Sequence, residues 1–333
     1  MKSFLNKTVV VTGASAGVGR AIARRFGIAG ARLGLIARDA KALDEVKTEI
    51  EQAGGTAIVA AADVADAEAV GAAADEIAHR LGPIEVWVND AMVTVFAPVW
   101  DITPAEFRRV TEVTYLGVVH GTMAALRHMR KRNRGTIIQI GSALAYRGIP
   151  LQAAYCGSKH AIRGFTDSLR TELIHSGSAI NVAVMELPAV NTPQFDWART
   201  HMRRRPRPVP PVVQPEAIAR AVYRAARHPR REYWVGWTTI KVILANMLVP
   251  GLLDRYLAKV AFEGQLTPTP VSVDRKDNLF APVHKLHGTR GSFGSEASRS
   301  AFTVAGPTAR LIPVIAGGII VLGFGLLAGR RGG

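Results

Sequence analysis

The chain has 333 residues, of which 48% are hydrophobic and 20% are charged, and its formal net charge at pH 7 is +16. This composition excludes a disordered protein and allows a sizeable core in one large domain or two ordinary ones. The single cysteine, Cys156, excludes an intramolecular disulfide and a metal site with several cysteine ligands, and it fits a reducing, cytosolic setting.

The first two thirds of the chain alternate short apolar runs with helical patterns. The runs are rich in Val and Ile, as buried parallel strands are. They cover residues 8–12, 32–37, 56–61, 85–89, 136–140, 180–185 and 232–237. Strand–helix alternation at this spacing predicts an α/β fold with a doubly wound, parallel, seven-stranded Rossmann sheet in a single domain.

The first predicted strand leads into a glycine-rich turn, TGASAGVG at residues 12–19, and then into a helix. Gly13, Gly17 and Gly19 allow a tight turn and let phosphate oxygens approach the main chain. The helix that starts near Val18 directs free N–H groups and the positive end of its dipole toward that point. The pattern predicts a pyrophosphate-binding loop that includes Ser15.

The second predicted strand ends at Ala37 and is followed by Arg38. An acidic residue at this point binds the ribose 2′-hydroxyl of NAD, whereas a basic residue suits the additional 2′-phosphate of NADP. Asp39 comes next, but the residues after it have the character of a helix, so Asp39 is predicted to be the helix N-cap. The pattern therefore favours NADP(H) as the cofactor.

The stretch AAYCGSKHA, residues 153–161, places Tyr155 four residues before Lys159. On a helix, residues four apart lie on one face. Because an ammonium near a phenol favours the phenolate, we expect the pKa of Tyr155 to fall from its ordinary value of about 10. Such a tyrosine exchanges protons near neutral pH.

With TGASAGVG and YCGSK both in place, residues 5–240 resemble the short-chain dehydrogenase/reductases. The resemblance implies that Tyr155 acts as general acid in reduction or general base in oxidation. It implies that Lys159 lowers the pKa of Tyr155 and binds the nicotinamide ribose. Ser142, which precedes Tyr155 by 13 residues, would bind the substrate oxygen and stabilise its developing charge.

The resemblance extends to other cofactor-binding positions. Asp63 and Val64 match the pair that holds the adenine, and Pro188 and Thr192 match the segment that closes over the nicotinamide. Asn89 opens what is N-N-A-G in the family, although this chain has N-D-A-M at residues 89–92.

The helix after the fourth strand departs from the family at one position. Thr114 occupies the place of an asparagine that helps hold a water linking the lysine to bulk solvent. A threonine has one hydroxyl and cannot offer the same amide pair, but it can still bind a water. Thr114 is therefore a candidate catalytic residue, and it puts in question the relay of protons from the lysine through this water to bulk solvent.

The last third of the chain changes in character. Residues 240–262 predict two short helices, with a break at residues 250–251, that either cap the domain or lie on a membrane. The domain is thus predicted to cover residues 1–262, and the Pro-, Gly- and Ser-rich residues 263–310 to form a flexible linker. Residues 311–329 hold no charge, and as a helix they span about 28 Å, close to the hydrocarbon core of a bilayer. They predict a transmembrane helix that anchors a catalytic domain facing the cytoplasm.

The positive charge is concentrated between residues 199 and 232, where ten arginines face two acidic residues. No nucleic-acid-binding motif accompanies this segment, so no nucleic-acid partner is predicted, and the segment is either a solvated surface or one attracted to an anionic membrane. The histidines show no metal-ligand spacing, so no metal is predicted. The family resemblance implies a possible homodimer through the helix that carries Tyr155 and Lys159.

The leading hypothesis is a membrane-anchored, NADP(H)-dependent carbonyl reductase or secondary alcohol dehydrogenase. Its substrate is expected to be a small lipophilic molecule, because the loops after the fourth to seventh strands carry Phe96, Trp100, Phe195 and Trp197. One alternative is a non-catalytic NADP-binding sensor or scaffold of the same fold. Another is an enzyme of this fold with different chemistry, such as epimerisation.

Overall fold

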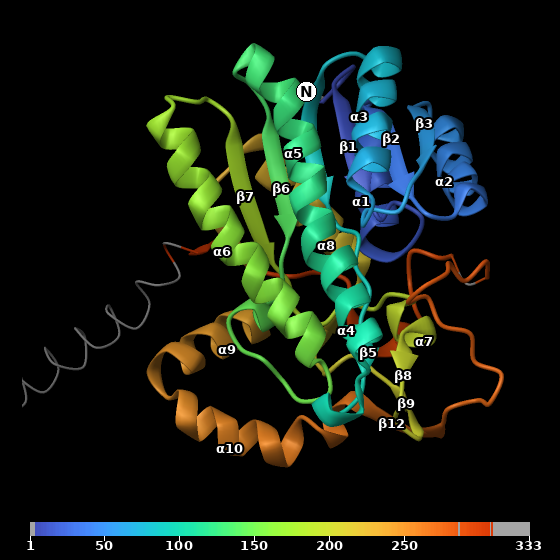
Figure 1. Cartoon of the computed structure of the whole chain (residues 1–333), viewed down its shortest axis with the longest axis vertical. Coiled ribbons are helices and arrows are strands. Elements are labelled where there is room, and N and C mark those ends of the chain that lie inside the picture. The colour runs from blue at the N-terminus through green and yellow to red at the C-terminus, as the bar shows by residue number, and fades with distance from the viewer. Residues whose placement is uncertain (1–3, 286, 307, 309–333) are drawn as a thin grey trace, which may run out of the picture.

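The computed structural model describes residues 4–285, 287–306 and 308, and an eight-stranded sheet forms its centre (Figure 1). The strand order is β14-β11-β7-β6-β4-β1-β2-β3. The strands are β1 (Thr8–Thr12), β2 (Arg32–Ala37), β3 (Thr56–Ala61), β4 (Ile84–Asn89), β6 (Thr136–Ile140), β7 (Asn181–Glu186), β11 (Glu232–Val235) and β14 (Thr303–Ala305). The seven predicted strands are all present and parallel. The strand count was wrong by one, because β14 adds to the edge, antiparallel to β11.

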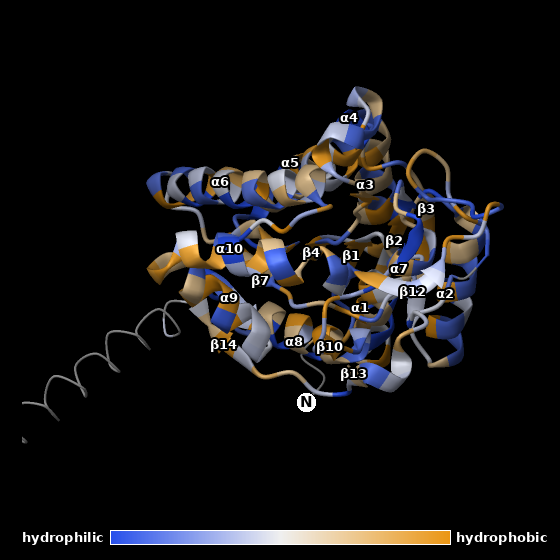
Figure 2. Cartoon of the chain, turned by 90° about the horizontal axis from the view of Figure 1, so that it is seen from below, coloured by the Kyte–Doolittle hydropathy of each residue, from blue (hydrophilic) through white to orange (hydrophobic). Residues whose placement is uncertain are grey.

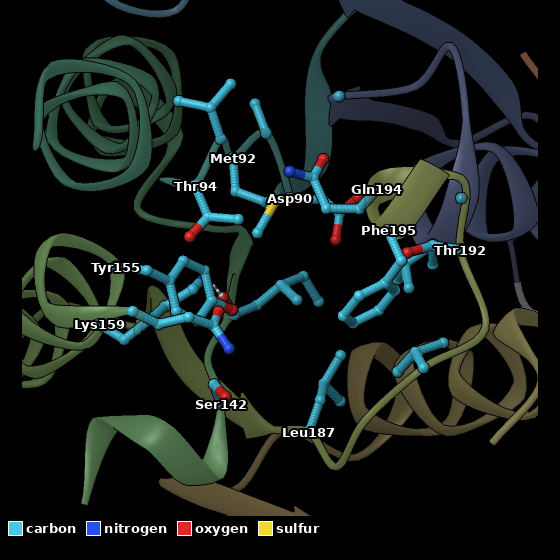
Figure 3. Close-up of a pocket in the computed structure, with 18 of the residues that line it drawn as sticks. Asp90, Met92, Thr94, Ser142, Tyr155, Lys159, Leu187, Thr192, Gln194 and Phe195 are labelled. Carbon is cyan, nitrogen blue, oxygen red and sulfur yellow. Dashed lines mark hydrogen bonds between the residues drawn. The ribbon is translucent and has the colours of Figure 1, made fainter. Parts of the chain in front are cut away.

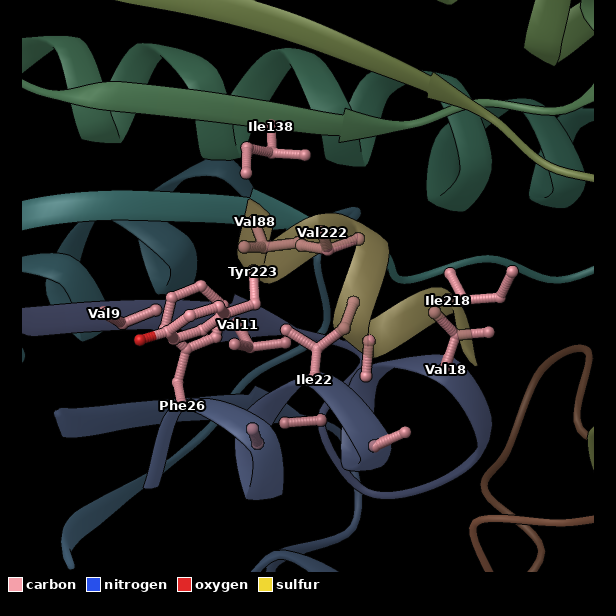
Figure 4. Close-up of a cluster of buried hydrophobic side chains, with 14 of the residues drawn as sticks. Val9, Val11, Val18, Ile22, Phe26, Val88, Ile138, Ile218, Val222 and Tyr223 are labelled. Atoms are coloured by element: carbon pink, nitrogen blue, oxygen red, sulfur yellow. The ribbon is translucent and has the colours of Figure 1, made fainter. Parts of the chain in front are cut away.

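Helices cover both faces of this sheet. One layer consists of α1 (Gly17–Ile28), α2 (Ala40–Gln52) and α8 (Pro215–Arg227), and the other of α3 (Ala67–Leu81), α5 (Gly117–Met129) and α6 (Ala153–His175). Figure 4 shows the first interface, where Val9 and Val11 of the sheet face Ile22 and Phe26 of α1. Each fully buried side chain of this size stabilises the fold by about 1.5–3 kcal/mol.

The order of the strands reverses next to β1, whose neighbours are β2 and β4. In doubly wound sheets, ligands bind beyond the carboxyl ends of the strands at such a switch point. The glycine-rich turn, Arg38 and Asp90 each follow directly after a strand, and Ser142 lies two residues beyond the end of β6. The topology therefore brings the predicted site residues to one edge of the sheet.

Shorter elements build up the rim of that edge. They are β5 (Val95–Phe96), α4 (Pro104–Thr111), a π-helical turn (Glu112–Leu116), α7 (Gln194–Trp197), β8 (Arg199–Thr200), β9 (Arg204–Pro206) and β10 (Val212–Val213). A capping box starts α4, in which Thr103 accepts from the N–H of Glu106 and the Glu106 carboxylate accepts from the N–H of Thr103.

Two helices follow the last parallel strand, as predicted. They are α9 (Trp237–Leu248) and α10 (Pro250–Val260), which meet at Val249 and lie beyond the carboxyl ends of the sheet strands (Figure 1). Hydrophobic residues are spread along both helices (Figure 2). The outward-facing Leu252 and Tyr256 of α10 are 64% and 60% exposed.

The prediction that residues 263–310 form a flexible linker is wrong for the part that the structure describes. β12 (Leu266–Pro270) pairs with β9, β13 (Ala297–Ser298) pairs with β10, and β14 joins the central sheet. The segment between β12 and β13 crosses the rim of the sheet edge and buries Leu279 completely. Backbone pairing and burial of this kind could not be read from a sequence without periodicity.

Within the described ranges, no helix is long and apolar enough to cross a membrane. The predicted transmembrane helix at residues 311–329 lies outside those ranges.

Candidate active site

The glycine-rich turn is built by close backbone approaches that exclude side chains. Gly13 and Gly17 have φ angles of +71° and +57°, which favour glycine. A Cβ at Gly19 would lie 2.3 Å from the carbonyl oxygen of Gly13, and one at Gly13 would lie 2.8 Å from the Cα of Ala91. The turn therefore brings the N-terminus of α1 directly against the ends of β1 and β4, as a phosphate-binding loop requires.

A cavity of about 380 Å³ runs along this edge of the sheet (Figure 3). Most predicted site residues line it: Gly13, Ser15, Gly17, Val18, Arg38, Asp63, Val64, Ser142, Tyr155, Lys159, Pro188 and Thr192. Three do not line it: Gly19, Asn89 and Thr114. The sequence motifs therefore converge in one place although they are spread over 180 residues.

Tyr155 and Lys159 lie one turn apart near the start of α6, and both face the cavity (Figure 3). The Nζ atom of Lys159 lies 5.5 Å from the centre of the Tyr155 ring and donates a hydrogen bond of 2.6 Å to the carbonyl of Ile140. Ser142, which follows β6, forms a hydrogen bond with the Tyr155 phenol. The three side chains thus form one contiguous group.

The pKa of Tyr155 differs from the sequence expectation. Burial raises it above its ordinary value, and the hydrogen bond with Ser142 opposes this shift only in part. Burial also lowers the pKa of Lys159 to about 8, against the opposing charges of Asp90 and Glu186. The phenol is therefore protonated at neutral pH, as a proton donor must be.

Asp90 is a site residue that the sequence analysis noted only as a departure from a motif. Its carboxylate lies in the cavity, and the N–H of Gly19 donates to it. Burial raises the pKa of Asp90 to about 7, and the nearby charge of Lys159 opposes the shift. The second position of N-D-A-M thus places a titrating group against the phosphate-binding loop.

Two predicted site residues serve other contacts. The buried hydroxyl of Thr114 donates to the carbonyl of Val93 at 2.9 Å and accepts from the N–H of the same residue at 3.1 Å. It therefore holds the strand-to-helix loop and does not reach the cavity. The side chain of Asn89 accepts from Trp87 at 2.7 Å and donates to Gln139 at 2.8 Å, which ties β4 to β6.

The other end of the cavity lies beyond β2 and β3. Asp39 caps α2 as predicted, accepting from the N–H of Ala42 at 3.2 Å. The carboxylate of Asp63 forms an ion pair with Arg109. The guanidinium of Arg38 donates to two carbonyls of the C-terminal segment, those of Asn278 at 2.6 Å and Leu279 at 3.3 Å. That segment lines the cavity here, and no motif in the sequence pointed to it.

The end of the cavity near Ser142 has apolar walls. They come from the predicted loops and from α9 and α10, and they include Met92, Phe96, Leu144, Ile149, Leu187, Phe195, Val242, Leu253 and Leu257. Trp197 lines the cavity at the other end, beside His287. Trp100, also expected there, is 81% exposed and does not line the cavity.

A family model described as short chain dehydrogenase matches residues 7–203. The chain belongs to the short-chain dehydrogenases. This confirms the resemblance drawn from TGASAGVG and YCGSK, and it makes the chain a member of an oxidoreductase family.

This short-chain dehydrogenase is similar to proteins from three organisms. An uncharacterized oxidoreductase of Bacillus subtilis, YxnA, is 30% identical over 307 residues, which are 92% of this chain and 86% of that protein. A fatty acyl-CoA reductase of Acinetobacter baylyi is 30% identical over 227 residues, covering 68% and 75%. An alcohol dehydrogenase from the archaeon Thermococcus sibiricus, solved with 5-hydroxy-NADP, is 27% identical with a TM-score of 0.60, covering 68% of this chain and 95% of that one.

Proposed function

We propose that this short-chain dehydrogenase is an NADP(H)-dependent oxidoreductase that interconverts carbonyl and secondary alcohol groups of lipophilic small molecules. One observation carries the proposal: Ser142, Tyr155 and Lys159 meet in the same cavity as the glycine-rich turn. A cavity with a phosphate-binding loop at one end and a hydrogen-bonded proton donor near the other fits a dinucleotide and a substrate side by side.

The residues of the cavity fit the cofactor. The turn at residues 13–19 would hold the pyrophosphate, and Arg38, Asp63 and Val64 would hold the adenosine half. Tyr155, Lys159, Pro188 and Thr192 would hold the nicotinamide half. When bound, NADPH supplies the hydride for the carbonyl carbon. Arg38 supports NADP over NAD, as does the NADP derivative in the Thermococcus sibiricus relative.

The chain itself supplies the proton and the charge stabilisation. In reduction, the phenol of Tyr155 gives its proton to the carbonyl oxygen of the substrate. The hydroxyl of Ser142 donates to that oxygen and stabilises the negative charge that develops on it. The ammonium of Lys159 stabilises the phenolate that remains. Because burial raises the pKa of Tyr155, the phenol carries at neutral pH the proton that reduction requires.

The apolar walls support a lipophilic substrate. Leu253 and Leu257 of α10 line the cavity, and the rings of Phe96 and Phe195 lie with their centres 6.0 Å apart. The fatty acyl-CoA reductase among the relatives supports the same class of substrate. A lipophilic ketone or aldehyde is therefore the first compound class to test.

A membrane-associated location with the catalytic domain in the cytoplasm is part of the proposal. Two features support it: the uncharged residues 311–329, and the exposed side chains Leu252, Tyr256 and Val260 along the outer face of α10. We expect the full-length chain to sediment with anionic phospholipid vesicles and a chain ending at residue 308 to do so more weakly. Equal partitioning of both chains into the supernatant would contradict the location but not the activity.

The activity is tested by following NADPH oxidation by the full-length chain with a panel of lipophilic and small polar ketones and aldehydes. We expect turnover with the lipophilic members and a preference for NADPH over NADH. NADPH binding without turnover of any carbonyl would instead favour the sensor or scaffold. That alternative is supported by the altered N-D-A-M segment and by Thr114, whose buried hydroxyl bonds to the backbone of Val93.

A further inference from the structure

The C-terminal segment passes over the adenosine end of the cavity as a strap, defined here as residues 277–291, of which all but residue 286 are described. Asp277 binds Arg199 at 2.9 Å at one end of the strap, and the N–H of Gly291 donates to the carbonyl of Asn191 at 3.2 Å at the other. Between them, the carbonyl of Gly288 accepts from the N–H of Gly17 at 3.0 Å. The strap is thus fixed to the rim and to the glycine-rich turn itself.

The strap contacts both residues that follow β2, the position that distinguishes NAD from NADP. Its carbonyls at Asn278 and Leu279 accept from Arg38, as described above, and so orient the guanidinium. Its histidines contact Asp39: Nδ1 of His284 lies 2.7 Å from Oδ2 of Asp39, and Nε2 of His287 lies 3.2 Å from the same oxygen.

The contacts to Asp39 involve both oxygens of its carboxylate. Oδ1 accepts from the N–H of Ala42, and Oδ2 faces both histidines, so the side chain is only 5% exposed. Burial by itself would raise the pKa of Asp39, but the hydrogen bonds from Ala42 and His284 outweigh it and hold the pKa below its ordinary value. Asp39 is therefore ionised, and its negative charge interacts with the strap histidines and with the N-terminus of α2.

Neither ring nitrogen of His287 forms a hydrogen bond among the described residues, although Nε2 lies within ion-pairing distance of Asp39. Its side chain is 10% exposed, lines the cavity, and lies beside Trp197 with ring centres 5.2 Å apart. Both nitrogens are buried, and Nδ1 has neither a hydrogen bond nor an ion pair within the described part of the chain. A buried ring nitrogen without a partner is costly unless a ligand satisfies it.

We propose that the strap determines the choice of cofactor, because His284 and His287 withdraw Asp39 from a ribose 2′-hydroxyl and leave Arg38 and His287 to receive a 2′-phosphate. This inference rests on the proposed function, since it requires a bound dinucleotide. A free aspartate at this position would accept a hydrogen bond from the NAD ribose and repel the phosphate of NADP. The two strap histidines beside the carboxylate of Asp39 oppose both the hydrogen bond to the NAD ribose and the repulsion of the NADP phosphate.

The test is isothermal titration of the full-length chain with NADPH and with NADH, so that binding is measured without turnover. The wild type is expected to bind NADPH more tightly. In His284→Ala/His287→Ala, the ratio of the two affinities is expected to shift toward NADH by about tenfold or more, the size of a hydrogen bond to a charged group. Adding Asp39→Asn to the double variant removes the charge, keeps a good helix cap, and is expected to return most of the preference for NADPH.

Two controls separate this effect from loss of the strap as a whole. Arg290→Ala removes a strap ion pair with Glu216 on the exposed surface and is expected to leave the affinity ratio unchanged. His284→Ala alone changes a side chain that is 74% exposed, so it is expected to fold and to show a smaller shift in the same direction.

Three outcomes would decide against the inference. An unchanged ratio in the histidine variants would overturn it. An equal loss of affinity for both dinucleotides would show that the strap only closes the site. A ratio that Asp39→Asn does not restore would remove Asp39 from the explanation. Failure of the wild type to bind either dinucleotide would instead contradict the proposed function.

Discussion

Asp90 brings a carboxylate to the point where the glycine-rich turn meets Lys159. A Cβ at Gly19 would lie 2.9 Å from Oδ2 of Asp90, so this oxygen lies against the backbone that is expected to hold the pyrophosphate. With a pKa of about 7, the group is neutral in mildly acidic solution and negative in mildly basic solution. The ammonium of Lys159 offsets this negative charge in part.

We therefore predict that dinucleotide affinity falls as the pH rises through 7, because ionised Asp90 repels the pyrophosphate. Asp90→Asn keeps the shape of the side chain without the charge, so it should flatten the pH dependence and bind more tightly at pH 8, by up to about tenfold. The dissociation constants of NADPH and NADH between pH 6 and pH 8.5 check this. NADH serves as the control for titration of the 2′-phosphate, and an unchanged slope in the variant for both cofactors would contradict the prediction.

The residues of the site could be predicted from the sequence where a local motif fixes them. The spacing of Tyr155 and Lys159 follows from one helical turn, and the three glycines follow from a strand–turn–helix pattern. The direction of the Tyr155 pKa could not, because it depends on burial by elements far away in the chain. The contacts of Thr114 could not be predicted for a similar reason, because its hydroxyl bonds to the backbone of Val93, 21 residues away in sequence. Its catalytic role stays a prediction.

At the scale of elements, α10 has two different apolar faces. Leu253 and Leu257, four residues apart, line the cavity, whereas Leu252 and Tyr256 face outward. A helix with apolar residues on both faces closes the cavity with one face and leaves apolar side chains exposed on the other. It also gives a matched pair of positions for separating the role of the cavity from that of the surface.

Leu257→Ala is expected to lower kcat/KM for the lipophilic substrate by about tenfold, because the truncated wall contacts less of the substrate in the transition state. Leu252→Ala is the matched control on the outer face, and we expect no change in kcat/KM measured in detergent-free solution with a soluble substrate. Equal effects of the two substitutions would show that α10 contributes only to folding.

At the scale of the whole molecule, the C-terminal segment and the arginine-rich segment stabilise each other. Arg199 pairs with Asp277 of the strap, Arg204 with Glu263 and Arg207 with Glu296. The positive charge of residues 199–232 is thus balanced in part by acids that lie far away in sequence. The sequence analysis described residues 199–232 as either a solvated surface or one attracted to a membrane. It could not predict these ion pairs, because contacts between distant segments leave no local signal in the sequence.

The same contacts predict that the folding unit extends beyond residue 262. A chain ending there loses β14 from the central sheet and the fully buried Leu279. We expect its Tm to lie more than about 5 °C below that of a chain ending at residue 308, since the lost burial alone is worth a few kcal/mol. Thermal unfolding followed by circular dichroism compares the two. Equal Tm values would support a domain boundary at residue 262, with the later residues contributing nothing to its stability.

The homodimer that the family resemblance implies stays a prediction.

The central claim is that the phenol of Tyr155 supplies the proton in an NADPH-dependent reduction. Tyr155→Phe removes one oxygen and leaves the ring, so the decisive measurement is the rate of NADPH oxidation by this variant and by the wild type with the best carbonyl substrate. We predict that NADPH still binds, with an affinity lowered by at most about tenfold for the lost hydroxyl contact. The rate is expected to fall by about 10²–10⁴, the usual contribution of a general acid. A variant that keeps the rate of the wild type would contradict the account.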